Sequence, residues 1–333
     1  MNDRADCDYK KLVEYKRNGL VEQVHCGIII HMNREKILNK VGEDNNYPFY
    51  YRSCMKPLQA AILVDLNLHK KYNFTLEDIA VFCASHTGDV IHQQKILSVL
   101  EKIESSEDDL LCPPIQPLSK EEQKRLVINN LPVMKIHNNC SGKHSLMLAI
   151  CKHKNFNINN YKDYKHPLTE IIINKVSELC EISNGGYIIS KDGCGLPVIA
   201  SSLENLGKGY LNLFLNPKYQ VFKQAFINYP YLIGGKERLD SEIINANKNL
   251  IAKVGAGGLC VVVNLKKEEC VVVKVADSNM EARSFTVITV LKQLKWLEEE
   301  DISSSPLNNI YKREIISQDN EVLGILSPCF KVY

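Results

Sequence analysis

The 333-residue chain has no excess of charge of either sign and no long hydrophobic run. Lys and Arg number 41 and Asp and Glu number 39, which gives a formal net charge of +2. This balance provides no electrostatic attraction for nucleic acid or for an anionic membrane surface. The longest apolar runs, such as Ile28–Ile30 and Val271–Val273, suit strands and are far too short to span a bilayer. We therefore expect neither nucleic acid nor a membrane as a partner.

The chain also lacks two features of secreted proteins. Its first six residues are mostly polar or charged and contain no apolar core of a signal peptide. Its twelve cysteines are scattered from Cys7 to Cys329 without a close C-x-x-C pair. In a cytoplasmic protein such cysteines are mostly reduced, small core residues. The sequence thus predicts a soluble, cytoplasmic protein.

No internal repeat, long linker or low-complexity segment divides the chain. Hydrophobic residues make up 45% of it, which is ample for one large core. We expect a single domain over residues 1–333. Its terminal parts, about 10–52 and 248–298, are predicted to be rich in strands, and its middle, about 53–247, to be mostly helical.

Turn and periodicity signals support this division. Asn18-Gly19 is a strong hairpin signal within a predicted β-meander over 10–41. Apolar residues at helical spacing predict a helix over 53–66. In the last third, strands are expected over 250–254, 259–264 and 270–275, followed by a helix over about 280–298. Together these elements predict an α+β fold, in which helices cover an antiparallel sheet and a helical subdomain is inserted.

Ser53 and Lys56 form the first candidate catalytic pair. They are three residues apart at a predicted helix start, where Pro57 is tolerated, so the hydroxyl and the amine can share one face. A serine needs a neighbouring base to become a nucleophile, and a lysine can serve if burial or a nearby cation lowers its pKa. Alone, however, S-x-x-K more often marks a capping serine and a solvated lysine.

Two further motifs follow in order along the chain. Ser85 lies in a small-residue loop, and Lys253 precedes Gly255 at the end of a predicted strand. The order S-x-x-K, serine loop and K-x-G is that of the penicillin-recognising serine enzymes. There the second serine relays a proton, the second lysine supplies positive charge, and the strand offers N–H groups for an oxyanion hole. In the simpler interpretation, Ser85 caps a helix and Lys253 is a surface lysine.

Cys140 and Lys143 are also three residues apart, and Cys194 lies in a glycine-flanked loop. Thiolates are good zinc ligands, but two cysteines are too few for a closed structural site. Spacing alone therefore favours buried thiols over a metal site. His144 and Asp192 flank these positions and, on spacing alone, are most simply hydrogen-bonding loop residues.

Six motifs, taken together and in order, resemble the L-asparaginase II family, the serine–lysine type of bacterial asparaginase. The resemblance runs from about Leu12 to Leu297. The motifs are Arg52–Gln59, Ala84–Gly88, Cys140–His144, Asp192–Pro197, Arg238–Ser241 and Lys253–Ala256.

The resemblance implies a fold similar to serine β-lactamases and glutaminases, and the hydrolysis of L-asparagine to L-aspartate and ammonia. It implies that Ser53 is the nucleophile, Lys56 is its base, and Ser85 and Lys253 are a second Ser–Lys pair. It further implies a zinc site that supports substrate binding, and a homodimer. The implied zinc ligands are Cys140, Lys143 and Cys194, and the implied substrate contacts are Arg52, His144, Asp192, Arg238, Gly255 and Ala256.

The sequence departs from the family pattern at three positions. Gly257, Ser241 and Ser145 stand where the family usually has Glu, Thr and Gly. The missing carboxylate at 257 alters the charge near Lys253. Two alternatives therefore stay open: an enzyme with another amide specificity, such as a glutaminase or a β-lactam or peptide amidase, and a catalytically silent homologue that binds an amino acid or a metal.

Overall fold

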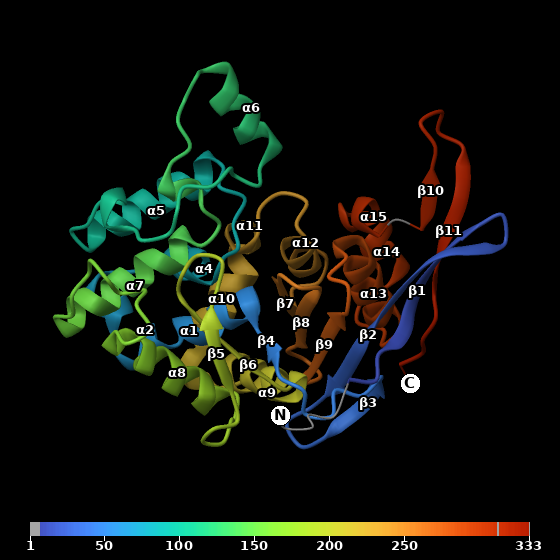
Figure 1. The fold of residues 1–333 in the computed structure, drawn as a ribbon, viewed down its shortest axis with the longest axis horizontal. Helices are drawn as coiled ribbons and strands as arrows, with labels where there is room; N and C mark the ends of the chain where they lie inside the picture. Colours follow the sequence, from blue (N-terminus) through green and yellow to red (C-terminus); the bar gives the residue numbers. More distant parts are fainter. Residues whose placement is uncertain (1–6, 312, 333) are drawn as a thin grey trace.

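A computed structural model describes residues 7–311 and 313–332 of the chain; the polar segment 1–6 lies outside the described residues. Figure 1 shows a sheet with its covering helices beside a mainly helical part. The sheet has eight strands in the order β10-β11-β1-β2-β9-β8-β7, with β3 paired to β2. All neighbouring strands in it are antiparallel. The strands are β1 Lys10–Arg17, β2 Leu20–Met32, β3 Ile37–Val41, β7 Leu250–Gly255, β8 Leu259–Asn264, β9 Glu269–Val275, β10 Glu314–Ile316 and β11 Val322–Pro328.

The predicted α+β fold class, with helices on an antiparallel sheet and a helical subdomain, is confirmed. A small second sheet, in the order β4-β6-β5, lies between the two parts and consists of β4 Phe49–Tyr50, β5 Ile188–Lys191 and β6 Pro197–Ser201. The longer helices are α4 Leu76–Cys83, α5 Val90–Lys102, α6 Lys120–Ile128, α7 Ser141–Lys154, α8 Pro167–Leu179, α9 Leu203–Phe214, α10 Gln220–Asn228, α12 Leu239–Ala246 and α13 Met280–Gln293. The shorter ones are α1 Lys56–Ala60, α2 Ile62–Asp65, α3 Leu68–Lys71, α11 Pro230–Ile233, α14 Glu299–Ser303 and α15 Leu307–Ile310, with 3₁₀ turns η1 Arg52–Met55, η2 Glu107–Asp109, η3 Lys135–His137 and η4 Pro217–Tyr219.

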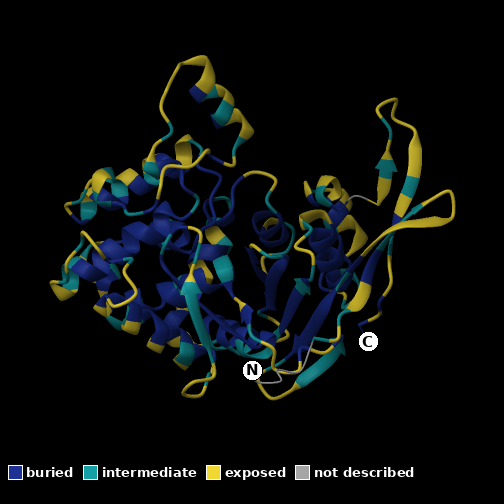
Figure 2. Ribbon diagram, viewed as in Figure 1, coloured by how far each residue is buried: buried dark blue, intermediate teal, exposed yellow. Residues whose placement is uncertain are grey.

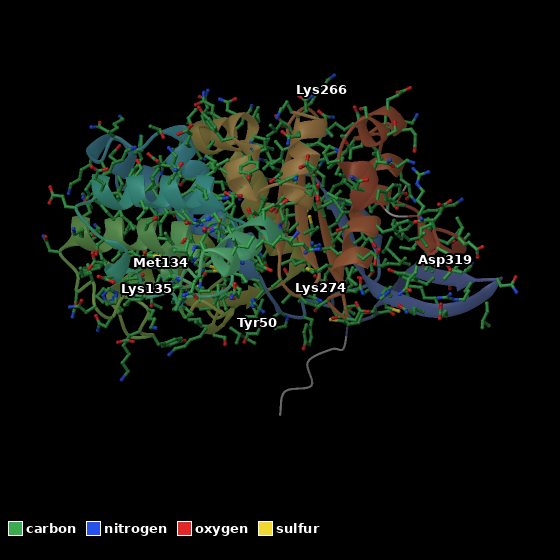
Figure 3. All side chains as sticks on the ribbon, turned by 90° about the horizontal axis from the view of Figure 1, so that it is seen from above. Tyr50, Met134, Lys135, Lys266, Lys274 and Asp319 are labelled. Carbon is green, nitrogen blue, oxygen red and sulfur yellow. The ribbon has the colours of Figure 1, made fainter. Side chains whose placement is uncertain are left out.

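The helix expected over 53–66 is divided in the structure. It begins as the 3₁₀ turn η1, continues as α1 and is interrupted at Ala61 before α2. The strands β10 and β11 were not expected at all. Several of their apolar side chains, such as Val322 and Ile325, are exposed, so no buried face imposes a clear alternation on the sequence. Figure 1 shows the β10–β11 hairpin projecting from the body, and Figure 3 labels Asp319, which lies between its two strands.

The core continues from the sheet into the helical part. Every residue of β7 and β8 is buried, and Figure 2 shows buried residues running from these strands into α1, α4 and α7. α1 packs against α4, and η1 packs against β7. The start of α1 is therefore held between the two parts of the molecule, which is where the predicted Ser53–Lys56 pair lies. Within the described residues, no helix has both the length and the apolar character to cross a membrane.

Candidate active site

The turn that carries Ser53 is held in an uncommon conformation. Arg52, which precedes it, has a φ of 46°, in the left-handed region that non-glycine residues adopt at a cost of about 1–2 kcal/mol. Such conformations persist where the surrounding structure imposes them, and they cluster at functional sites. Ser53 is half-buried within η1. Lys56 follows this turn directly as the first residue of α1. Because residues i and i+3 are nearly eclipsed in 3₁₀ geometry, we expect the side chains of Ser53 and Lys56 to leave the backbone on the same side.

Lys56 is almost completely buried, and its amine contacts three oxygen atoms. Its Nζ lies 2.6 Å from the carbonyl oxygen of Ala84, 3.0 Å from that of Asn139 and 3.1 Å from Ser85 Oγ. A neutral amine has two hydrogens and one lone pair. The two carbonyls can accept the hydrogens, and the lone pair then faces the Ser85 hydroxyl.

The environment of Lys56 favours this neutral form. Burial lowers the pKa of Lys56 below its ordinary value of 10.5, and the positive charges of Lys143 and Lys253 lower it further, while Cys140 and Cys194 oppose the shift. Burial disfavours the charged ammonium, because the ammonium loses more hydration free energy than the neutral amine does. Lys56 therefore has the character of a general base.

Ser85 does not cap the helix that follows it. Asp89 caps α5 by accepting from His92 N, and the Ser85 backbone N–H donates instead to Ile233 O over 3.0 Å. The next residue is also held: His86 Nδ1 accepts from Gly88 N, so its Nε2 donates to Ser141 Oγ over 3.0 Å. The Ser85 hydroxyl is thus presented to Lys56 by a loop that is fixed on both sides.

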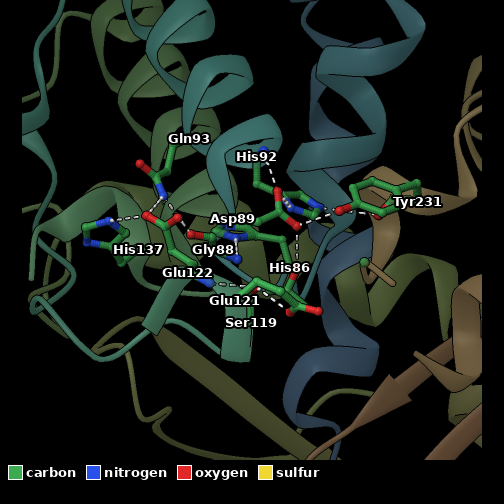
Figure 4. A network of polar contacts seen from close by, with 12 residues as sticks. His86, Gly88, Asp89, His92, Gln93, Ser119, Glu121, Glu122, His137 and Tyr231 are labelled. Carbon is green, nitrogen blue, oxygen red and sulfur yellow. Dashed lines mark hydrogen bonds and ion pairs between the residues drawn. The ribbon is translucent and has the colours of Figure 1, made fainter. Parts of the chain in front are cut away.

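A polar network supports this loop from outside (Figure 4). Asp89 Oδ2 accepts from Thr87 Oγ1 over 2.8 Å and from Tyr231 OH over 2.7 Å, and its Oδ1 lies 2.8 Å from His92 Nδ1. The ring of His92 is stacked between those of His86 and Tyr231. The hydrogen bonds to Asp89 more than offset its partial burial and lower its pKa, so it stays ionised. These residues hold the loop that carries Ser85.

Lys253 lies in the core and not at the surface. Its Nζ donates to Asp240 Oδ2 over 2.9 Å and to Val254 O over 3.2 Å, and both charged side chains are fully buried. Although burial opposes ionisation, Lys253 and Arg238 lower the pKa of Asp240. Removal of one partner from such a buried pair costs about 3–5 kcal/mol. Lys253 is therefore fixed near Lys56 as a positive charge, with Asp240 as its partner.

The predicted metal ligands also come together. The Cys140 side chain is the main cause that lowers the pKa of Cys194 well below its ordinary range, while Cys140 Sγ donates a hydrogen bond to Asn139 Oδ1 over 3.4 Å. Burial opposes the charged form of Lys143, but the sulfurs of Cys194 and Cys140 and the Asp192 carboxylate raise its pKa. All three side chains are buried. In the described part of the chain, no three His, Cys, Asp or Glu side chains are arranged to hold a metal ion, so a site here would need the Lys143 amine.

Asp192 links this cluster to the surface. Its Oδ1 accepts from Arg52 Nε over 2.8 Å, and its Oδ2 lies 3.7 Å from Lys143 Nζ. The Arg52 side chain is 38% exposed, whereas that of Asp192 is 8% exposed. This ion pair therefore stands at the edge of the site, one residue before Ser53, and presents both signs of charge.

The other predicted substrate contacts lie around this group. His144 is buried, its Nδ1 lies 2.7 Å from Tyr161 OH, and its Nε2 has no hydrogen-bond partner among the described residues. Burial and the charge of Lys143 lower its pKa to about 3, so the ring is neutral. Gly255 ends β7 against η1: a Cβ there would come within 3.0 Å of Cys54 Sγ. Arg238 is half-buried directly before α12, near Asp240.

The family is decided by one comparison: the model of the family described as L-asparaginase II matches residues 13–328. The chain belongs to the L-asparaginase II family. No curated protein was found to match it. Among solved structures, the chain is similar to the crystal structure of a β-lactamase from Mycobacterium bovis, with a TM-score of 0.43 and 13% sequence identity. The similar region covers 82% of this chain and 95% of the β-lactamase chain.

Membership of the L-asparaginase II family confirms the resemblance drawn from the six motifs and indicates a hydrolase that acts on amides. Within this family member, two of the predicted catalytic lysines have contacts that their spacing in the sequence did not predict. Ser85 contacts Lys56, and Lys253 contacts Asp240. The pairing of Ser53 with Lys56 and of Ser85 with Lys253 stays a prediction.

Asp240 is the main residue that the motif analysis missed. It lies inside the Arg238–Ser241 motif, but no pattern in the sequence indicates its partner, Lys253, 13 positions further on. A buried ammonium requires a counter-charge. The carboxylate of Asp240, inside a motif, was therefore a candidate partner for Lys253.

Proposed function

We propose that this protein hydrolyses the side-chain amide of L-asparagine to L-aspartate and ammonia through an acyl-enzyme on Ser53. The observation that carries the proposal is Lys56: a desolvated amine, three residues after a half-buried serine, whose lone pair can face the hydroxyl of a second serine. An alcohol nucleophile, a base of lowered pKa and a proton relay are the parts that amide hydrolysis by acyl transfer requires.

In the first half-reaction, the Lys56 amine turns its lone pair from Ser85 towards Ser53. Ser53 Oγ then forms a bond to the amide carbon while its proton passes to this neutral amine. Negative charge then develops on the carbonyl oxygen. Ser85, which is 3.1 Å from Lys56 Nζ, can receive a proton from Lys56 as it gives its own to the leaving nitrogen. The C–N bond breaks, ammonia leaves, and Lys56 is again neutral.

In the second half-reaction, water attacks the ester carbon, and Lys56 takes a proton from this water. The tetrahedral intermediate collapses, the bond to Ser53 Oγ breaks, and the proton returns to that oxygen. Lys253, held by Asp240, remains charged throughout, and its positive charge favours the neutral form of Lys56. The net change is the addition of one water to the amide.

The Arg52–Asp192 ion pair supports an α-amino acid as the substrate class. An α-amino acid carries an ammonium and a carboxylate on one carbon. It can replace this one ion pair with two, by placing its ammonium on Asp192 and its carboxylate on Arg52. Both side chains lie next to the catalytic turn, so a substrate bound there would have its side-chain amide directed towards Ser53.

An ammonia-release assay on L-asparagine, L-glutamine and succinamic acid tests this function. Succinamic acid is asparagine without its amine, so it cannot use Asp192. We expect turnover of asparagine, weaker turnover of glutamine because its amide is one methylene further from the ion pair, and a raised KM for succinamic acid. A chromogenic β-lactam serves as the unrelated amide. Binding of asparagine in a calorimeter with no ammonia released, with or without zinc, would contradict the proposal.

We also propose that Cys140, Lys143 and Cys194 hold a zinc ion. The donors fit: two sulfurs in contact and an amine beside them are ligands that zinc accepts, with a fourth position for water or substrate. The Lys143 amine would have to lose its proton on binding, so affinity should rise with pH. When bound, the ion supplies positive charge that positions the substrate. The nucleophile remains Ser53.

We predict about one zinc per chain in protein purified without chelator, as measured by elemental analysis. Cys194→Ala should reduce this content severely, because only one thiolate would remain. The exposed Cys329 gives a matched control, and Cys329→Ala should keep the metal. Zinc-free native protein, or equal zinc content in the two variants, would count against the site. The homodimer and the cytoplasmic location stay predictions.

A further inference from the structure

A buried arginine behind the catalytic strand has no place in the motifs described above. Arg283 lies on α13 and is 6% exposed. Its Nη1 donates to the carbonyl oxygen of Gly255, the last residue of β7, over 3.2 Å. Burial and the nearby charge of Arg238 lower the pKa of Arg283, so this guanidinium is held at an electrostatic cost. A charge retained at such a cost needs an explanation beyond packing.

The direction of the Gly255 carbonyl determines the direction of another group. A trans peptide is planar, with its C=O and N–H on opposite sides. No cis peptide bond occurs among the described residues, so the Ala256 N–H points away from the oxygen that Arg283 binds. By holding the Gly255 oxygen in place, Arg283 therefore also sets the direction of the Ala256 N–H.

The register of β7 shows where this N–H points. Among the described residues, β7 is the last strand of the sheet and pairs only with β8, so no described strand lies along its other edge. Along a strand, successive residues direct their N–H groups to opposite edges. The Val254 N–H donates to Asp240 on the free edge, over 3.3 Å. The Ala256 N–H, two residues further, therefore leaves on the same edge as Asp240.

The end of β7 adjoins the catalytic turn. η1 packs on the end of β7, and at Gly255 a Cβ would lie 3.0 Å from Cys54 Sγ and 3.4 Å from Tyr51 O. Ser53 lies between these two residues. A backbone N–H that is fixed beside the nucleophile, with a cation bound at the other end of its peptide, is an oriented donor for negative charge that develops on the substrate oxygen.

We propose that Arg283 is a positioning residue, which binds the Gly255 carbonyl and thereby directs the Ala256 N–H into the oxyanion hole. The inference rests on the proposed acyl transfer at Ser53. It assigns Arg283 no contact with substrate. Its action is confined to the steps in which the carbonyl oxygen becomes negative, namely the formation and breakdown of the tetrahedral intermediates.

The test compares Arg283→Met, Arg283→Lys and the control Lys292→Met, which removes a half-buried cation, paired with Glu299, from the same helix. Two rates are measured for each: turnover of asparagine, and acetylation of Ser53 by p-nitrophenyl acetate followed by mass spectrometry. The activated ester has neither an ammonium nor a carboxylate, so its rate is independent of amino acid recognition. Thermal unfolding and circular dichroism give the folded fraction by which each rate is corrected.

We expect Arg283→Met to lower both kcat and the acetylation rate by about 10²–10³-fold, as the loss of one oxyanion donor does, with KM near the wild-type value. Arg283→Lys should recover part of both rates, and Lys292→Met should match the wild type. A raised KM with an unchanged acetylation rate, or equal losses in Lys292→Met, would overturn the proposal. If the wild type released no ammonia but Ser53 were acetylated, the asparaginase function would fail while the role of Arg283 would still be decided.

Discussion

Ser53→Ala is expected to lower kcat for asparagine by about 10⁵-fold or more, to the level of substrate binding and oxyanion stabilisation alone. The hydroxyl is the group that forms the covalent bond, so no other residue of the site can replace it. Because Ser53 is half-buried and its removal leaves no charge unpaired, the free energy of unfolding should change by only about 0.5 kcal/mol. Ammonia release and chemical denaturation measure the two effects separately.

The control for this variant is a buried serine near the site. Ser145 lies on α7, and its Oγ donates to Gly142 O over 2.7 Å, within its own helix. Ser145→Ala should keep the wild-type kcat. Mass spectrometry of the wild type, quenched during turnover, should find an aspartyl group on Ser53 that Ser53→Ala lacks. Comparable turnover by Ser53→Ala and the wild type would remove Ser53 from the mechanism.

The strands and helices with one buried face were the predictable part of the fold. The hairpin at Asn18-Gly19 lies between β1 and β2 as expected, because this dipeptide adopts the positive φ values that the turn requires. By contrast, β6 falls in the segment expected to be mainly helical and loops. All five of its residues are buried, so its sequence shows no alternation, and a short apolar run fits a buried helix as well as a strand.

The members of the candidate site could be predicted from their motifs, whereas their pairing could not. Spacing along a turn relates Ser53 to Lys56, because both lie within one local element. The contacts of Lys56 with Ser85 and of Lys253 with Asp240 bridge 29 and 13 positions, so they depend on how α1, α4, α12 and β7 pack together. A local sequence pattern cannot predict contacts between such distant positions. A family resemblance indicates which residues form the site, but not which of them contact each other.

Lys56→Arg is expected to lower kcat by about 10⁴-fold, the upper range for loss of a general base. Arginine keeps a positive charge, but it stays protonated at any working pH and cannot accept the Ser53 proton. Lys56→Met provides the second variant, with similar length and neither charge nor base, and should lose as much. Lys274 is the matched control: burial lowers its pKa too, but it lies on β9, two strands from Lys253. Lys274→Met should keep the wild-type kcat.

The pH profile separates a base from a merely structural lysine. Only the neutral amine can accept a proton, so kcat/KM should rise with pH through the pKa of Lys56 and level off above it. Burial lowers that pKa below 10.5, because the ammonium form loses its hydration, so the rise should be centred below that value. The residual activity of Lys56→Arg should lack this rise, while Lys274→Met should show it unchanged. If Lys56→Arg kept the same rising limb, the base would be another group, and Lys56 would act only through its hydrogen bonds to Ala84, Asn139 and Ser85.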